Sequence, residues 1–171
     1  MTMHEGLFLL RLVVGLVMAA HGAQKLFGWF GGYGIAGVAP FFESLGFRPG
    51  RFFASAAALS EFAGGLLVTL GLLGPIGPAL LVSVMIVAAV SVHWKNGLFA
   101  TSNGIEVPLL YGVAGAALAL TGPGRYSLDA LLGLSSLWTP AVTWAALVIG
   151  IVGAIANLAL RRPVAQTAAA H

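Results

Sequence analysis

Five ionisable residues lie inside or at the ends of long apolar segments: His21, Lys25, Glu61, His93 and Glu106. On insertion scales a charged side chain in hydrocarbon costs at least about 2.5–3.5 kcal/mol, so such residues are usually paired or functional. Imidazole, ammonium and carboxyl groups can together exchange protons and hydrogen-bond a polar ligand. These residue types therefore indicate a polar site within an apolar surrounding.

The spacing of these residues brings some of them together. His21, Gln24 and Lys25 lie on one helix face, because side chains three and four residues apart are neighbours. Glu61 lies about nine residues into its apolar segment, roughly 13 Å deep at 1.5 Å per residue. We expect this carboxyl to be neutral or paired with Lys25 or His21. The catalytic candidates are Glu61 and His21, and the ligand-binding candidates are Lys25, Gln24, His93 and Glu106.

Each of these side chains also has a purely structural interpretation. Lys25 can extend to the lipid headgroups, and His93 can be an interface residue beside Trp94. Glu106 can cap its own helix, and His21 can donate an interhelical hydrogen bond. Glu61 is the hardest to explain structurally, because it lies deepest.

The elements that carry these residues are apolar helices. The 171 residues are 59% hydrophobic and 8% charged, with a mean hydropathy of +0.98, whereas soluble domains carry about 25% charged residues. A bilayer span needs about 20 apolar residues, and five segments qualify: 7–27, 52–73, 76–94, 105–120 and 141–160. We predict an all-α transmembrane bundle, with four helices in residues 1–137 and a fifth helix plus a frayed tail in residues 138–171.

Two connecting segments predict short helices at the membrane surface. Residues 39–47 are amphipathic, and we expect Phe41, Phe42 and Leu45 to enter lipid, the alternative being an aromatic loop. A second short helix is expected after residues 122–126. Ser127 would cap it, with Asp129 in the first turn, where carboxylates are favoured.

Other residues are expected to hold the bundle together. Gly64 and Gly65 share a face with Glu61, and small side chains let membrane helices approach closely. Arg11, Arg125 and Asp129 gather at the opposite end of the bundle, where we predict an ion pair.

Alternation of the spans places the polar residues at one end of the bundle. Helices one and three end where helices two and four begin, so His21, Lys25, Glu61, His93 and Glu106 should converge from four helices. Basic residues concentrate at that end: Lys25, Arg48, Arg51, Lys95, Arg161 and Arg162. Cytoplasmic loops are rich in Lys and Arg, so we expect this end inside and the N-terminus outside.

Four short motifs carry a resemblance to a known family: residues 21–25 (HGAQK), residues 61–65 (EFAGG), His93 with residues 96–97 and 104–106, and residues 122–129 (GPGRYSLD). In this order, they are similar to the signatures of the DoxX family over roughly residues 7–133. The resemblance implies a small bacterial membrane protein of four spans, linked with quinone handling and membrane redox complexes. The fifth apolar segment departs from that pattern.

The function predicted first is a quinone-linked redox subunit of the cytoplasmic membrane. Glu61 would exchange protons, and His21 or Lys25 would hold a carbonyl oxygen. The chain has no cysteine, so the redox centre would belong to a bound cofactor or a partner subunit. One alternative is a haem protein that uses His21 and His93, or a divalent-metal protein that adds Glu61 and Glu106 to them. Another is a non-enzymatic carrier, transporter or assembly module. Scattered basic residues argue against nucleic-acid binding, and a homo-oligomer is an open expectation.

Overall fold

The chain is all-α, as predicted. The computed structural model describes residues 3–162, and no strand occurs among them. Seven α-helices follow one another along the chain: α1 (Met3–Phe27), α2 (Gly34–Ser44), α3 (Gly50–Leu70), α4 (Ile76–Ala88), α5 (Glu106–Thr121), α6 (Leu128–Leu131) and α7 (Pro140–Ala159). Short helical turns continue α4, namely the π-helical turn Ala89–His93 and a 3₁₀ turn, Trp94–Asn96.

Four helical segments are long and apolar enough to cross a bilayer: Met3–Phe27, Gly50–Leu70, Ile76–Asn96 and Pro140–Ala159. The fourth predicted span, 105–120, is present as α5 with its bounds shifted by one residue. Its 16 residues extend about 24 Å, less than the ~30 Å of a typical hydrocarbon core. A compact loop precedes α5, and Gly122 ends it at a positive φ of 75°. The architecture is nonetheless that of a multi-pass membrane bundle.

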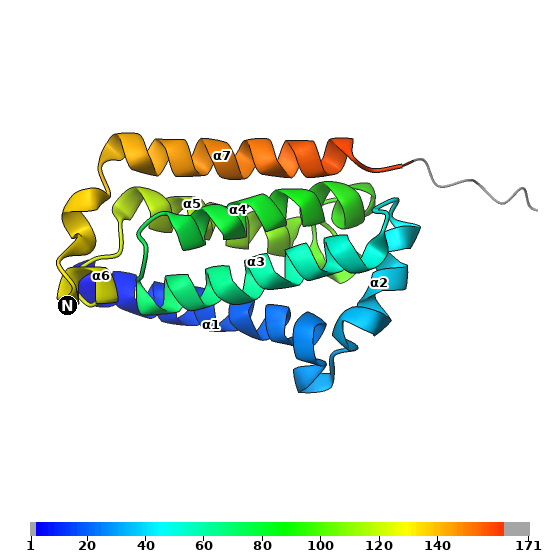
Figure 1. Cartoon of the computed structure of the whole chain (residues 1–171), viewed down its shortest axis with the longest axis horizontal. Helices are drawn as coiled ribbons and strands as arrows, with labels where there is room; N and C mark the ends of the chain where they lie inside the picture. The colour runs from blue at the N-terminus through cyan, green and yellow to red at the C-terminus, as the bar shows by residue number, and fades with distance from the viewer. Residues whose placement is uncertain (1–2, 163–171) are drawn as a thin grey trace, which may run out of the picture.

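The long helices pack in the order α1, α3, α4, α5, with α7 lying on α4 and α5. Figure 1 shows α1 and α7 on opposite sides of the bundle, with α2 crossing one end and α6 lying at the other. A core cluster joins α1, α3, α4 and α5 through residues Val14, Met18, Val68, Leu81, Met85 and Leu118. Large apolar side chains on the outside of the bundle, such as Val13 and Ile149, are exposed and suited to lipid contact.

Glycines set the distances between the helices that carry the polar residues. A Cβ on Gly65 would lie 2.6 Å from the Gly15 carbonyl oxygen on α1. A Cβ on Gly64 would lie 2.8 Å from the Leu81 side chain on α4. Adjacent glycines on α3 therefore bring α1 to one side of the helix and α4 to the other. On α1, Gly22 likewise approaches the α3 backbone.

The predicted helix before the second span is present as α2, but its side chains are distributed differently from expectation. Phe41 is exposed, as expected of a residue in lipid. Phe42 and Leu45 are less exposed than predicted: both are half-buried and, like Phe41, they line a cavity beneath α2. The reason is that α2 folds back onto α3, where Phe42 packs 6.1 Å from Phe47, ring centroid to centroid.

The opposite end of the bundle is held by contacts between charged side chains and the backbone. Ser127 caps α6 by accepting a hydrogen bond from Ala130 N, as predicted. Buried Arg11 donates to the Tyr126 carbonyl at 2.5 Å and to the Pro123 carbonyl.

The predicted ion pair at this end is absent. Buried Asp129 accepts from Leu73 N and Gly74 N at 3.0 and 2.6 Å, and Arg125 lies exposed over the Tyr126 ring. Loop backbone groups take the place of the expected charge partner.

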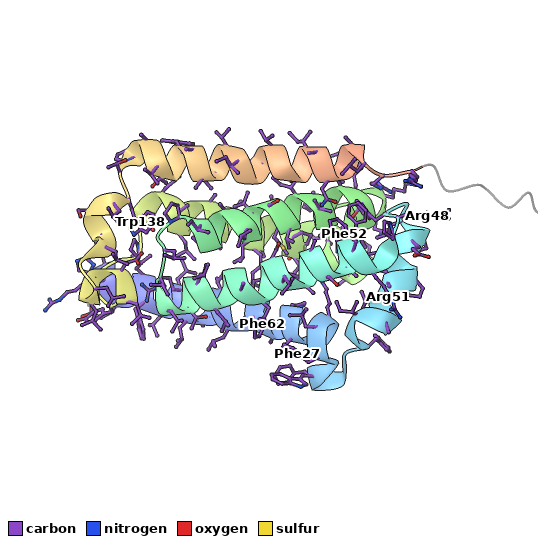
Figure 2. All side chains as sticks on the ribbon, viewed as in Figure 1. Phe27, Arg48, Arg51, Phe52, Phe62 and Trp138 are labelled. Atoms are coloured by element: carbon purple, nitrogen blue, oxygen red, sulfur yellow. The ribbon has the colours of Figure 1, made fainter. Side chains whose placement is uncertain are left out.

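Basic residues collect at the end that carries α2. Figure 2 shows Arg48 and Arg51 there and Trp138 at the other end. Two hydrogen bonds tie the end of α7 to the segment after α2: Arg161 donates from Nε to the Leu45 carbonyl, and Arg162 N donates to the Gly46 carbonyl. From residue 163 onward, the predicted frayed tail lies outside the described residues.

Candidate functional site

The centre of the candidate site is an ion pair between Lys25 of α1 and Glu61 of α3. Glu61 is only 4% exposed, whereas the Lys25 side chain is 26% exposed. Lys25 Nζ donates to Glu61 Oε1. The other carboxylate oxygen, Oε2, is buried and accepts no hydrogen bond from any group in residues 3–162. An unsatisfied buried acceptor costs about 1–3 kcal/mol or more, so this oxygen calls for a donor from outside the described chain.

Two cavities adjoin the ion pair, and both are lined by Lys25, Glu61 and His93. The first, of about 150 Å³, is completed by His21 and Tyr111 together with apolar side chains. The second, of about 200 Å³, runs beneath α2 and is walled by aromatic rings including Phe42 and Phe47. The ion pair therefore stands at the junction of a small polar cavity and a larger apolar one.

His93 reaches the site from the π-helical turn that ends the α4 segment. Single π-helical turns are rare and frequently occur at functional sites. His93 Nδ1 lies 2.8 Å from the Asn103 carbonyl oxygen. Because a carbonyl oxygen only accepts, Nδ1 carries the hydrogen and the neutral ring keeps Nε2 as an acceptor. The hydrogen bond fixes the tautomer of a ring that lines both cavities.

His21 and Gln24 occupy the margin of the site. His21 lines the smaller cavity and is exposed, with Nδ1 3.1 Å from the Val17 carbonyl oxygen one turn earlier. Gln24 faces elsewhere: its Nε2 donates to the Phe30 carbonyl at 3.2 Å and holds the turn after α1. Gln24 lines neither cavity.

Glu106 also lies outside both cavities. Its Oε2 accepts from Ala100 N at 2.7 Å, which ties the 3₁₀ turn Ala100–Ser102 to the start of α5. Glu106 therefore does act as a cap, but the backbone amide that it binds belongs to the preceding loop and not to its own helix. Of the six predicted site residues, His21, Lys25, Glu61 and His93 share a cavity, and Gln24 and Glu106 do not.

Comparison with known proteins places these residues in a family. The DoxX family model matches residues 6–94, which include α1, α3, α4 and all four predicted residues that share the cavity. The chain belongs to the DoxX family. A relative in Bacillus subtilis (strain 168), named "Putative oxidoreductase CatD", is 32% identical over 124 residues, covering 72% of this chain and 84% of the relative. No solved structure matches the chain significantly.

Beyond the DoxX match, α5 adds a residue that sequence reasoning missed. Tyr111 lines the small cavity from α5, in the place expected for Glu106. The available signal was weak: a tyrosine in an apolar helix, one turn after Pro108. Aromatic residues in such helices usually pack or mark an interface, so the residue type alone does not indicate a site.

Other parts of this DoxX-family chain gather fewer titratable side chains around a cavity. No group of three or more His, Asp or Glu side chains in residues 3–162 is arranged to hold a metal ion. A further cavity, of about 540 Å³, lies at the opposite end, where Trp138 and Arg125 are among its lining residues. Arg125 is the single formally charged side chain among the described residues that line it. The ion pair, both candidate imidazoles and Tyr111 all lie at the other end of the bundle.

Proposed function

We propose that the chain binds the ring of a lipid-soluble quinone beside Lys25 and Glu61, as the membrane subunit of a quinone-linked oxidoreductase. One observation carries the proposal: Glu61 is buried inside an apolar bundle, pairs one oxygen with Lys25, and leaves the other without a donor next to two cavities. A ligand hydroxyl, as on a reduced quinone, would supply that donor.

The chemistry of the cavity fits both redox forms of such a ring. Lys25 has three donor hydrogens for a quinone carbonyl oxygen, and Glu61 Oε2 accepts from a quinol hydroxyl. His93 Nε2 accepts in the neutral imidazole and donates when protonated. Drug-sized ligands occupy cavities of roughly 300–1,000 Å³. Spaces of about 150 and 200 Å³ therefore suit a single ring better than a porphyrin.

Reduction of a quinone requires two electrons and two protons. In the proposed site Glu61 and the imidazoles exchange the protons, with exposed His21 as the link to the surface. The chain has no cysteine, so the electrons come from a redox centre on a partner subunit. The relative's printed name, which calls it an oxidoreductase, supports this class of function.

We further propose that the protein lies in the bacterial cytoplasmic membrane with the site toward the cytoplasm. Basic residues mark cytoplasmic loops, and the end that carries α2 holds them: Lys25, Arg48, Arg51, Lys95, Arg161 and Arg162. Figure 1 shows the start of α1 and the end of α7 at opposite ends of the bundle, so this orientation leaves the N-terminus outside and the C-terminal end of α7 inside.

The test is thermal unfolding of the purified protein with quinones and quinols that lack a tail. Binding at 100 times Kd should stabilise the fold by about 2.7 kcal/mol and raise the melting temperature. Glu61→Gln and His21→Ala should abolish the increase. Glu106→Gln is the matched control, since it makes the same chemical change at the same end without touching either cavity. A wild-type protein that no such ring stabilises would rule out the proposal.

A further inference from the structure

An apolar groove runs along the bundle between α4 and α5, outside the polar site. It has a volume of about 290 Å³, and its lining includes Met85, Ala89, Trp94, Pro108, Gly112 and Ala116. No charged side chain among the described residues lines it. On its rim, Leu109 is 48% exposed and Val113 is 59% exposed, so the groove opens on the surface that faces lipid.

The groove adjoins the small polar cavity. Met85 and Pro108 line both spaces and form the boundary between them. The π-helical turn supplies Ala89 to the groove and His93 to the polar cavity. A polar environment and an apolar environment therefore lie side by side at Met85 and Pro108, as a ligand with a polar ring and an apolar chain would require.

We infer that this groove holds the first isoprenoid units of the quinone's hydrocarbon tail, and so selects ring-plus-tail ligands. The inference rests on the proposed function, since it extends the same site. From Pro108 to Ala116 the groove follows α5 for about 12 Å at 1.5 Å per residue. Beyond that length the tail continues into the bilayer past the exposed rim.

The cavity beneath α2 is the competing route for the tail, and its walls argue against it. Phe47, one of its lining residues, is only 1% exposed, and Phe42 and Leu45 turn inward. A tail there would lie under a helix, whereas the α4–α5 groove has a lipid-facing rim. Lipid is as apolar as the groove, so the preference arises from close packing rather than from the hydrophobic effect.

Gly112 offers a way to fill the groove. A Cβ at this position would lie 3.5 Å from the Met85 Cβ, an ordinary contact, so Gly112→Leu should fold and occupy the space. The matched control is Gly153→Leu on α7, where a Cβ would have its nearest neighbour, Ser83 Oγ, 4.0 Å away. Gly153 lines none of the cavities adjoining the site.

The experiment uses the whole chain in phosphatidylcholine nanodiscs and a quinone carrying a photoreactive diazirine on its first isoprenoid unit. Cross-linked peptides are identified by mass spectrometry. We expect labels within residues 85–89 and 108–116. Gly112→Leu should reduce this labelling about fivefold, the factor that ~1 kcal/mol represents, and Gly153→Leu should leave it unchanged. The melting-temperature increase given by a tailless ring should survive in both variants.

The outcomes separate the two proposals. Two results would overturn the inference while leaving ring binding intact. One is labelling mainly within residues 38–47. The other is equal labelling of the groove by a diazirine fatty acid at the same mole fraction. A tailless ring that fails to stabilise the wild type would instead remove the proposed function and this inference with it. Label mapping on the wild type decides the question even if the Gly112 variant does not fold.

Discussion

Replacing Lys25 alone and replacing Glu61 alone should destabilise the fold by different amounts, although each change breaks the same ion pair. Lys25→Met leaves a carboxylate that is 4% exposed with neither oxygen paired. Removing one partner of a buried pair costs about 3–5 kcal/mol, because the remaining charge is uncompensated. That is a large part of the 5–15 kcal/mol by which folded proteins are typically stable.

Glu61→Gln should be milder. The Lys25 side chain is already 26% exposed and lies two residues before the end of α1. Its stem can extend so that the ammonium reaches the headgroups. We expect a loss of about 1.5–3 kcal/mol, the usual net contribution of a hydrogen bond to a charged group. The two single variants should therefore differ by about 2 kcal/mol, with the lysine variant the less stable.

The assay is reversible unfolding in mixed detergent micelles, with helix content followed by circular dichroism. The double variant Lys25→Met with Glu61→Gln leaves no buried charge at this position and should be close in stability to Glu61→Gln alone. The magnitude of the coupling energy then equals the cost of Lys25→Met, about 3–5 kcal/mol, which lies at or above the upper end of the range for residues in direct contact. Equal costs for the two single variants, or additive costs in the double, would refute the reasoning from burial.

Three further substitutions test the surrounding structure. Gly22→Ala should destabilise the bundle by about 1–3 kcal/mol through overpacking against α3. Gly6→Ala, whose added methyl group meets open space, should leave the stability unchanged. Unfolding in the same micelles measures both. Asp129→Ala should cost about 2–4 kcal/mol by orphaning two backbone amides of the α3–α4 turn; the prediction fails if the variant melts like wild type. Glu106→Ala should speed hydrogen exchange at the Ala100 amide while leaving exchange in the centre of α3 unchanged, and unaltered exchange at Ala100 would contradict the assigned cap.

Much of this architecture was predictable from residue types because a bilayer imposes strong rules. Apolar runs of about 20 residues had to be helices, and their alternation brought His21, Lys25, Glu61 and His93 to one end. The glycines beside Glu61 indicated close helix contact. These features depend on periodicity and length, which a single sequence displays directly.

The features that were missed depend on loop backbone and on side-chain direction. The prediction of an ion pair among Arg11, Arg125 and Asp129 assumed that charged groups pair with each other, but loop carbonyls bind Arg11 and loop amides bind Asp129. Glu106 lies outside the cavity, which Tyr111 lines instead, because the loop before α5 folds back to place Ala100 N at the carboxylate. Neither outcome can be read from spacing, because each requires the conformation of a segment without regular periodicity.

Two buried carboxylates in this chain distinguish a structural group from a candidate functional one. Asp129 is fully buried, and each of its oxygens accepts a hydrogen bond from a backbone amide, so it needs nothing more. Glu61 is similarly buried, yet one of its oxygens has no donor in the described chain, and cavities lie beside it.

The ion pair is not needed to hold its helices together, because Gly22 and Gly65 already bring α1 against α3. Buried ion pairs are often no more stable than apolar side chains of similar volume. A half-satisfied carboxylate in an already close-packed bundle is therefore better explained by a ligand than by stability.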